Sequence, residues 1–218
     1  MAEEAKKAEL SIEEVLASTS IADVYQAAKQ LDGVAAKTHL IESPYFSDLC
    51  GNNVYLKPEN LQNTGSFKLR GAYNKISQLN EDERKRGVIT ASAGNHAQGV
   101  AFAARALNCK AVICMPATTP ILKVEATRAY GAEVVLYGDS FDDAYAKSLE
   151  LQKKKGYVYI HPFNDQKVLA GQGTTALEII DELKDVDAIL VPIGGGGFAS
   201  GVALATKAVN PNVKVIGV

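Results

Sequence analysis

The second part of the chain alternates short apolar runs with longer segments of helical pattern. From Gly87 onward the short runs are apolar on both faces, which is typical of strands buried in a parallel sheet. The predicted strands are residues 88–90, 111–114, 133–136, 158–160, 188–191 and 213–218, and the predicted helices are residues 95–107, 120–130, 140–154, 166–183 and 198–208. This order of elements predicts an α/β fold built on βαβ units.

The first 86 residues have a different pattern. They predict a helix with polar interruptions over residues 11–31, short strands over 39–42 and 53–57, and a helix over 67–79. No linker rich in Pro, Gly or Ser and no internal repeat separates the two parts. Domain boundaries must therefore depend on packing.

Composition narrows the possible partners. The 218 residues, at about 150 per domain, predict one large domain or two small ones. A net charge of −2 gives no basic surface for nucleic acid or an anionic membrane, so a small molecule is the expected partner. The three cysteines lack CxxC spacing, and neither a signal peptide nor a membrane span is evident, so we expect a cytoplasmic protein with reduced thiols.

A lysine stands in an unusual place in the segment 63–72. Lys68 falls in the first turn of a predicted helix, where the dipole disfavours a cation and lowers the pKa of its amine. A neutral amine is the form that condenses with aldehydes. A solvated surface lysine is the alternative, and Arg70 and Lys57 are consistent with ordinary surface charges.

Two further segments predict anion-binding turns. The turn Ser92-Ala93-Gly94-Asn95-His96 follows a predicted strand, where backbone N–H groups can hold a carboxylate. Asn95 could instead cap the next helix, and His96 could be an ordinary packed histidine. Four consecutive glycines, Gly194-Gly195-Gly196-Gly197, join another strand to a helix and predict a phosphate site, with a flexible loop as the alternative.

Other chemistries fit the sequence less well. Residues 194–199 match GxGxxA, but no acidic residue follows to hold a ribose, so a dinucleotide-dependent oxidoreductase is a weak alternative. Isolated histidines and cysteines give no metal site, and no GxSxG elbow is present. A lysine amine together with a phosphate cradle instead points to pyridoxal 5′-phosphate, which carries both an aldehyde and a phosphate.

The segments SFKLRGA, SAGNHAQG and GGGGF resemble the signatures of fold-type-II pyridoxal-phosphate enzymes, in the threonine/serine dehydratase and serine racemase branch. The resemblance covers residues 21–218 and includes HPFND at 161–165 and AGQGTTALEI at 170–179. It implies that Lys68 binds the cofactor aldehyde covalently, Phe67 packs beside the ring and Asn95 contacts the phenolic oxygen. It also implies that the phosphate is held by Gly194, Gly195, Gly196 and Gly197, and the substrate carboxylate by Ser92, Ala93, Gly94, Asn95 and His96.

The resemblance also implies the reaction. We expect β-elimination of L-threonine and L-serine to a 2-oxo acid and ammonia, with the amine of Lys68 removing the α-proton. Similar racemases have a serine at the position of Ala93, and alanine has no proton to donate, so dehydration is favoured over racemisation. The catabolic threonine dehydratases match best, whereas Leu69 and His96 argue against cysteine and threonine synthases.

The resemblance implies two three-layer αβα domains. We expect a larger cofactor-binding domain from residues 1–80 and 165–218, and a smaller substrate-turn domain from residues 81–164. In the similar family the larger domain continues beyond the position of Val218, so the expectation is a chain truncated at its C-terminus. The alternative is an inactive or weakly cofactor-binding fragment; a homo-oligomer is also expected.

Overall fold

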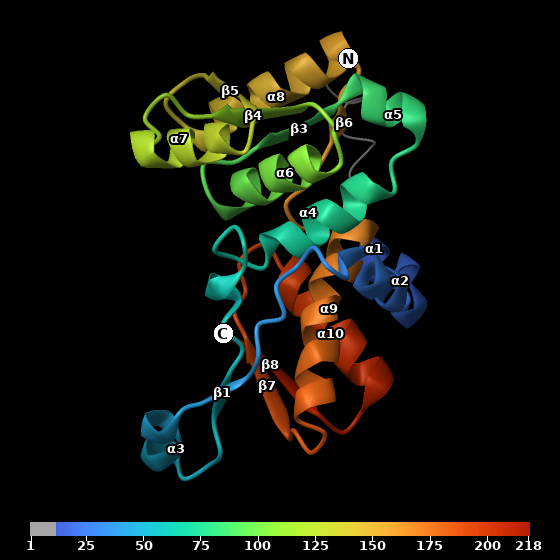
Figure 1. Ribbon diagram of the computed structural model, residues 1–218, viewed down its shortest axis with the longest axis vertical. Helices are drawn as coiled ribbons and strands as arrows, with labels where there is room; N and C mark the ends of the chain where they lie inside the picture. Colours follow the sequence, from blue (N-terminus) through green and yellow to red (C-terminus); the bar gives the residue numbers. More distant parts are fainter. Residues whose placement is uncertain (1–11) are drawn as a thin grey trace.

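The computed structural model describes residues 12–218, which form two lobes joined by the helix α4 (Lys68–Ser77). In Figure 1 the upper lobe contains a sheet with helices above and below it, and the lower lobe contains the remaining helices and two small sheets. The predicted mixture of helices and largely parallel strands is confirmed.

A parallel four-stranded sheet forms the centre of the upper lobe. Its strands lie in the order β5-β4-β3-β6. They are β3 (Val88–Ala91), β4 (Ala111–Met115), β5 (Glu133–Leu136) and β6 (Val158–Tyr159). Each begins and ends within one residue of its prediction, because the apolar runs are short and sharply bounded.

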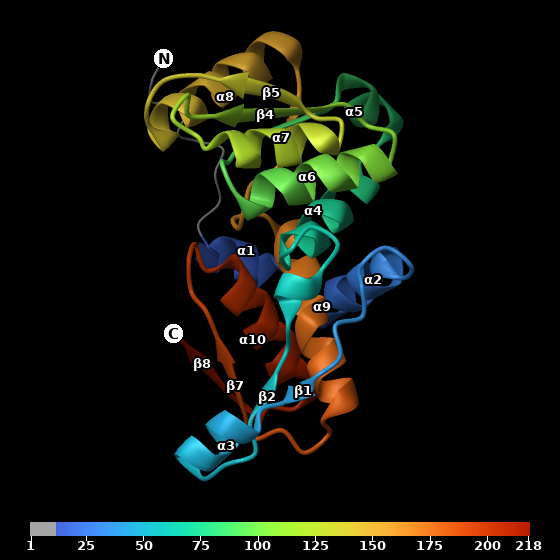
Figure 2. The same ribbon diagram turned by 60° about the vertical axis from the view of Figure 1, so that its left-hand side comes forward.

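Helices cover both faces of this sheet. Figure 2 shows α6 (Asn95–Ala106) and α7 (Ile121–Ala129) on one side and α8 (Phe141–Lys155) on the other. Side chains alternate along a strand, so Val88 and Ile113 pack toward α6 and α7, whereas Ile89 and Val112 pack toward α8. Burial on both faces explains why these strands read as continuous apolar runs.

The short helix α5 (Glu81–Arg86) was not predicted from the sequence. All six of its residues are charged, so it has no apolar periodicity to detect. It is specified by its ends: Asn80 and Glu83 form a capping box, acidic residues occupy the first turn and basic residues the last.

The lower lobe has its own parallel pair of strands. Strand β7 (Ala188–Val191) pairs with β8 (Lys214–Gly217), and the helices α2 (Ile21–Leu31), α9 (Gln166–Glu182) and α10 (Gly197–Val209) pack around them. Val24, Ile189 and Val202 are among the buried members of this core. The predicted strand at residues 213–218 is thus present over its central four residues.

The predicted single helix over residues 11–31 is wrong. Ser11 lies outside the described residues, and the rest forms two helices, α1 (Ile12–Ser18) and α2. The break follows from side-chain chemistry: the Thr19 hydroxyl donates back to the Val15 carbonyl, and Ser20 forms a capping box with Asp23 at the start of α2.

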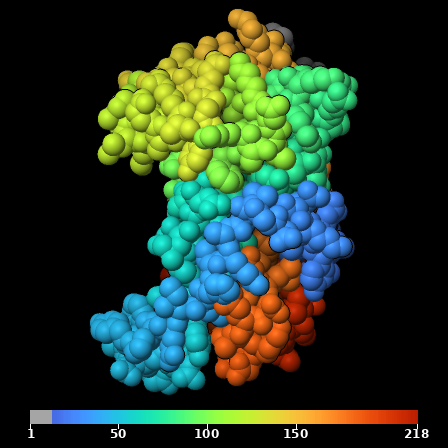
Figure 3. All heavy atoms as spheres, in the orientation of Figure 1, coloured from blue at the N-terminus to red at the C-terminus, as the bar shows by residue number. Residues whose placement is uncertain are grey.

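The segment between α2 and α4 projects from the lower lobe. It holds an antiparallel pair, β1 (Ile41–Glu42) and β2 (Tyr55–Leu56), the helix α3 (Pro44–Cys50) and a 3₁₀ turn, η2 (Glu59–Leu61). The projection stands out at the lower left of Figure 3. Both predicted strands exist as two-residue pieces, and α3 was missed because it has no buried residue.

Helix α4 packs against α6 and α9, and glycines make these crossings close. A Cβ on Gly171 of α9 would lie 2.6 Å from the carbonyl oxygen of Arg70, and one on Gly71 would lie 2.7 Å from that of Val168. On the other side, a Cβ on Gly99 of α6 would lie 3.0 Å from the backbone of Leu69. Helix α4 is therefore held between the two lobes by backbone-to-backbone packing.

The proposed division into two domains stays a prediction. The core of the upper lobe includes Ala72 and Ile76, so α4 contributes side chains across the predicted boundary at residue 80. Among residues 12–218, no helix is both long enough and apolar enough to cross a membrane.

Substituting Gly171 tests the importance of the α4–α9 crossing. Gly171→Ala should lower the free energy of unfolding by about 1–3 kcal/mol, because the methyl group overpacks the crossing despite the better helix propensity of alanine. Urea unfolding measures the change. The control Asp181→Ala, on the exposed face of α9, should change the stability by less than about 0.5 kcal/mol. Equal effects of the two substitutions would contradict this account of the crossing.

Candidate active site

The three segments singled out from the sequence meet around a fourth, residues 160–164, which follows β6. Lys68 Nζ donates to the carbonyl of Pro162 at 2.8 Å, and a ring nitrogen of His96 lies 2.9 Å from the carbonyl of Ile160. A Cβ on Gly197 would lie 2.7 Å from the carbonyl of Phe163. The loops after β3, β6 and β7 therefore gather at the start of α4.

Lys68 is half-buried as the first residue of α4. Its Nζ lies 5.4 Å from the centroid of the Phe67 ring, which itself stacks on Phe198 with a centroid distance of 4.0 Å. Burial lowers the pKa of the amine to about 8. About a tenth of such an amine is neutral at pH 7, so Lys68 can act as a nucleophile and as a base.

His96 is buried and neutral. Burial, opposed by the contact with Ile160 and reinforced by the charge of Lys68, lowers its pKa to about 3. Because a carbonyl only accepts, the proton lies on Nε2, and Nδ1 is a buried acceptor with no hydrogen-bond partner in the described chain. A base with so low a pKa is a poor proton acceptor, so Lys68 is the better candidate for that role.

The turn after β3 is fixed by Ser92. Its hydroxyl accepts hydrogen bonds from the backbone N–H groups of Gly94 and Ala97. Gly94, rather than Asn95, is the N-cap of α6, so the capping role considered for Asn95 is wrong. The Asn95 side chain is exposed and, within residues 12–218, makes no hydrogen bond, which leaves its amide available to a ligand.

The glycine loop joins β7 to α10. Gly196 is the N-cap of α10 with a left-handed φ of +86°, which favours glycine. In the described chain, the backbone N–H groups of Gly195, Gly196 and Gly197 donate no hydrogen bond. Together with the positive end of α10, these free donors suit an anion such as phosphate.

Arg70 is deeply buried, so its interpretation as a surface charge is wrong. All five of its N–H donors are used. They donate to both carboxylate oxygens of Glu59 at 2.8 Å, to both of Glu178 at 2.6 and 2.9 Å, and to the Thr174 hydroxyl at 3.1 Å. Lys57, also taken as a surface charge, donates to Glu178 at 2.6 Å and is largely buried. We call Arg70, Glu59, Glu178 and Lys57 the ion cluster.

The ion cluster is balanced in charge. Burial opposes the ionisation of Glu59, but the hydrogen bonds and charge of Arg70 outweigh it and hold the pKa of Glu59 below its usual value. Burial likewise opposes the charge on Arg70, and its bonds to Glu59 and Glu178 outweigh that, raising its pKa. Removing any one of the four residues would leave an uncompensated buried charge, so the cluster needs all of them.

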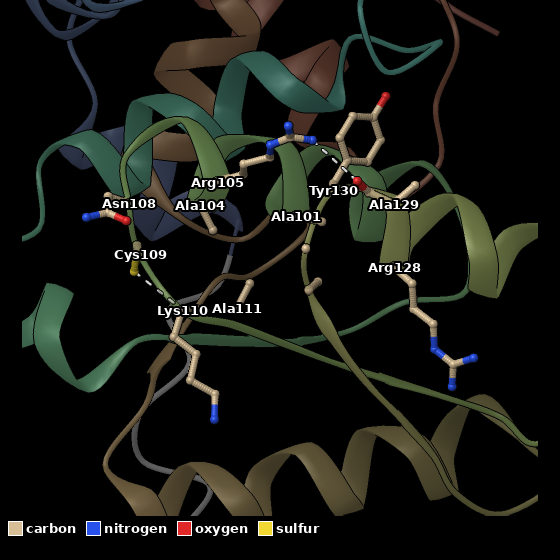
Figure 4. Close-up of a pocket in the computed structure, with 12 residues that line it drawn as sticks. Ala101, Ala104, Arg105, Asn108, Cys109, Lys110, Ala111, Arg128, Ala129 and Tyr130 are labelled. Carbon is tan, nitrogen blue, oxygen red and sulfur yellow. Dashed lines mark hydrogen bonds between the residues drawn. The ribbon is translucent and has the colours of Figure 1, made fainter.

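A separate hollow of about 530 Å³ lies at the opposite end of the sheet, between the ends of α6 and α7 (Figure 4). Arg105, Lys110 and Arg128 line it, but Figure 4 shows their charged ends pointing in different directions. None of the residues predicted for the active site lines this hollow, so the site is defined by its chemistry and not by this hollow.

Comparisons with known proteins found clear relatives of this chain. The profile of a family described as pyridoxal-phosphate dependent enzyme matches residues 31–218. L-threonine ammonia-lyase of Thermotoga maritima is 54% identical over 91% of the chain and 50% of its own length. In general, the chain spans about half to three fifths of the length of such curated relatives.

Solved structures show the same likeness. Threonine deaminase isoform 2 of Solanum lycopersicum superposes with a TM-score of 0.87 at 50% identity, covering 90% of this chain and 54% of the other. Maize serine racemase superposes with a TM-score of 0.89 at 36% identity, covering 92% of this chain and 61% of the other.

The neutral, buried His96 predicts a pH-dependent stability. Its pKa falls from 6.5 in the unfolded chain to about 3 in the fold, so the unfolded state binds more protons between these values and stability falls as the pH falls through them. Between pH 7 and pH 5 the loss should be about 2 kcal/mol by urea unfolding. His96→Gln, which can still donate to Ile160, should remove that slope, whereas His39→Gln on the surface should keep it. An unchanged slope in His96→Gln would refute the assignment.

Proposed function

Because the chain belongs to the family of pyridoxal-phosphate-dependent enzymes, we propose that it dehydrates and deaminates L-threonine, and also L-serine. The products are 2-oxobutanoate or pyruvate, together with ammonia. The observation that carries the proposal is the half-buried amine of Lys68, with a pKa of about 8, between the Ser92 turn and the glycine loop. The likeness to threonine ammonia-lyase and threonine deaminase supports the same reaction.

The residues of the site fit the cofactor of the family. Lys68 offers an amine that is partly neutral near pH 8, which suits an aldehyde. The unused N–H groups of Gly195, Gly196 and Gly197 suit a phosphate, and the exposed Asn95 amide is free to donate to a ring oxygen. We propose that Phe67, which is next to Lys68, packs beside the ring.

In the proposed reaction the protein orients the substrate and moves one proton. The bound cofactor supplies an electron sink for charge that develops at the α-carbon. The Ser92–His96 turn holds the substrate carboxylate through backbone N–H groups and keeps it in one orientation. The Lys68 amine removes the α-proton, since its pKa lies near the working pH, whereas the Nδ1 of His96 is too weak a base.

Ala93 supports elimination over racemisation. It is half-buried in the turn after β3, and its methyl group has no proton to give to the opposite face of the α-carbon. The likeness to maize serine racemase shows that the same backbone arrangement occurs in a racemase, so the choice between reactions depends on side chains. We place the chain on the dehydratase side for this reason.

Two broader features complete the proposal. We propose that the protein works in the cytoplasm as a homo-oligomer, in line with the expectation from the sequence. We also propose that residues 81–164 act as the substrate-turn domain and the rest as the cofactor-binding domain. Helix α4, which packs on both lobes, would then link substrate contact to cofactor contact.

Trapping the cofactor tests the proposal that Lys68 binds it covalently. Protein incubated with pyridoxal 5′-phosphate and reduced with borohydride should carry one pyridoxyl group, on Lys68, as located by peptide mass spectrometry. Lys68→Ala should lose both the adduct and the visible absorbance. Lys75→Ala, on the same helix, should keep them. An adduct elsewhere, or none, would sink the assignment; an adduct on Lys68 without turnover of threonine would favour the inactive-fragment alternative.

A substitution at Ala93 tests why dehydration is favoured over racemisation. Ala93→Ser should raise the rate of serine racemisation relative to dehydration by about tenfold or more, because it supplies a proton donor on the second face. Chiral chromatography of serine alongside 2-oxo acid release measures the ratio. Ala106→Ser, exposed at the far end of α6, is the control and should leave the ratio unchanged. No difference between the two variants would undercut this reading of Ala93.

A further inference from the structure

The segment 161–164 connects the predicted parts of the site, although no chemical role was predicted for it. Its Pro162 carbonyl accepts from Lys68, and its Phe163 packs against the glycine loop. One side chain in the segment, His161, holds the turn from within.

The Nδ1 atom of His161 binds the turn. It accepts hydrogen bonds from the backbone N–H groups of Phe163, at 3.2 Å, and Asn164, at 2.7 Å. Because both partners are donors, Nδ1 carries a lone pair, and the ring proton is on Nε2. The arrangement has the geometry of an Asx-type turn, in which a side-chain acceptor binds the N–H groups two and three residues further on.

This turn determines where the Pro162 carbonyl points. Pro162 lies directly between the acceptor ring and the two N–H groups that it binds, so fixing both ends of the turn fixes the peptide between them. That carbonyl is the hydrogen-bond partner of Lys68 Nζ at 2.8 Å. The upstream end is held separately, since His96 donates to the carbonyl of Ile160 at 2.9 Å.

The same turn determines where Phe163 lies. The imidazole of His161 packs edge-on against the Phe163 ring, with a centroid distance of 4.6 Å and an interplanar angle of 90°. The ring in turn lies against Gly195, where a Cβ would collide with it, and the Phe163 Cα lies 2.8 Å from the Cβ position of Gly197. A shift of the turn would therefore displace the glycine loop as well.

We propose that His161 is a positioning residue, whose Nδ1 sets the turn that places the Lys68 amine and the glycine loop relative to each other. The inference rests on the proposed function in that these two groups are the ones assigned to the cofactor. It adds that their spacing is controlled by an acceptor on the side chain of His161.

Two substitutions of similar size separate the acceptor from the ring. In His161→Asn, the side-chain oxygen can take the place of Nδ1 and accept the same two N–H groups. In His161→Gln, the longer side chain carries its oxygen beyond that position. Both variants remove the imidazole, and only the asparagine keeps an acceptor at the position of Nδ1.

The first readout needs no cofactor. Cofactor-free protein is treated with N-hydroxysuccinimidyl acetate at pH 8, and the rate of Lys68 acetylation is measured by peptide mass spectrometry. His161→Gln should acetylate Lys68 about two- to tenfold faster, the range expected when one hydrogen bond is lost, because the Pro162 carbonyl no longer holds the amine. His161→Asn should stay within about twofold of the wild type. Lys123, exposed on α7, supplies the internal reference rate.

The second readout is titration with pyridoxal 5′-phosphate, followed by visible absorbance. The apparent Kd should weaken about two- to tenfold in His161→Gln and stay near wild type in His161→Asn. Equal Lys68 acetylation in all three proteins would overturn the positioning role, and so would an asparagine variant that behaves like the glutamine variant. If the wild type failed to bind the cofactor while acetylation still separated the variants, the proposed function would fail but the positioning role would stand.

Discussion

The hydrogen bonds and ion pairs of the buried Arg70 guanidinium are the interactions on which the site depends. With all five donors engaged, the guanidinium ties α4 to η2 through Glu59 and to α9 through Glu178, and Lys57 joins the same cluster. The members of the cluster come from three separate stretches of chain, residues 57–59, 70 and 178, so the cluster can form only when all of them have reached their places. Two residues before Arg70 stands Lys68. The helix that carries the Lys68 amine is thus held in place by these charges, whereas the amine itself is bound by the Pro162 carbonyl.

Close packing at glycines holds α4, which carries Arg70, against both lobes. Close approach at Gly71 and Gly171 joins α4 to α9, and close approach at Gly99 joins α4 to α6. Helix α4 cannot move toward either lobe without a steric clash, so Lys68 remains at their junction. Burial there lowers the pKa of Lys68, and the same burial keeps His96 neutral. The acid–base assignments therefore follow from packing more than from any single hydrogen bond.

The strands and site segments that could be predicted from the sequence are those determined by residues close together in the chain. Buried strands such as β4 and β5 appear as apolar runs, and the three site segments stand out because lysine, asparagine and glycine occupy positions where packing gives no reason for them. Helix α5 was missed because caps and charges specify it, without apolar periodicity. Arg70 was misread because a buried arginine looks like a surface one until Glu59 and Glu178, distant in sequence, are brought to it.

The glycine loop shows how one sequence motif can satisfy several requirements. Its four glycines suggested a single reason, a backbone free to wrap a phosphate. In the structure Gly196 is needed for its left-handed conformation, whereas Gly195 and Gly197 are needed because Phe163 leaves no room for a Cβ. A Cβ on Gly194 would meet nothing within 4 Å, so only there is the absence of a side chain unexplained by the fold itself. The proposed phosphate binding does not account for every glycine of the loop, since the aromatic ring of Phe163 also determines which positions can carry a side chain.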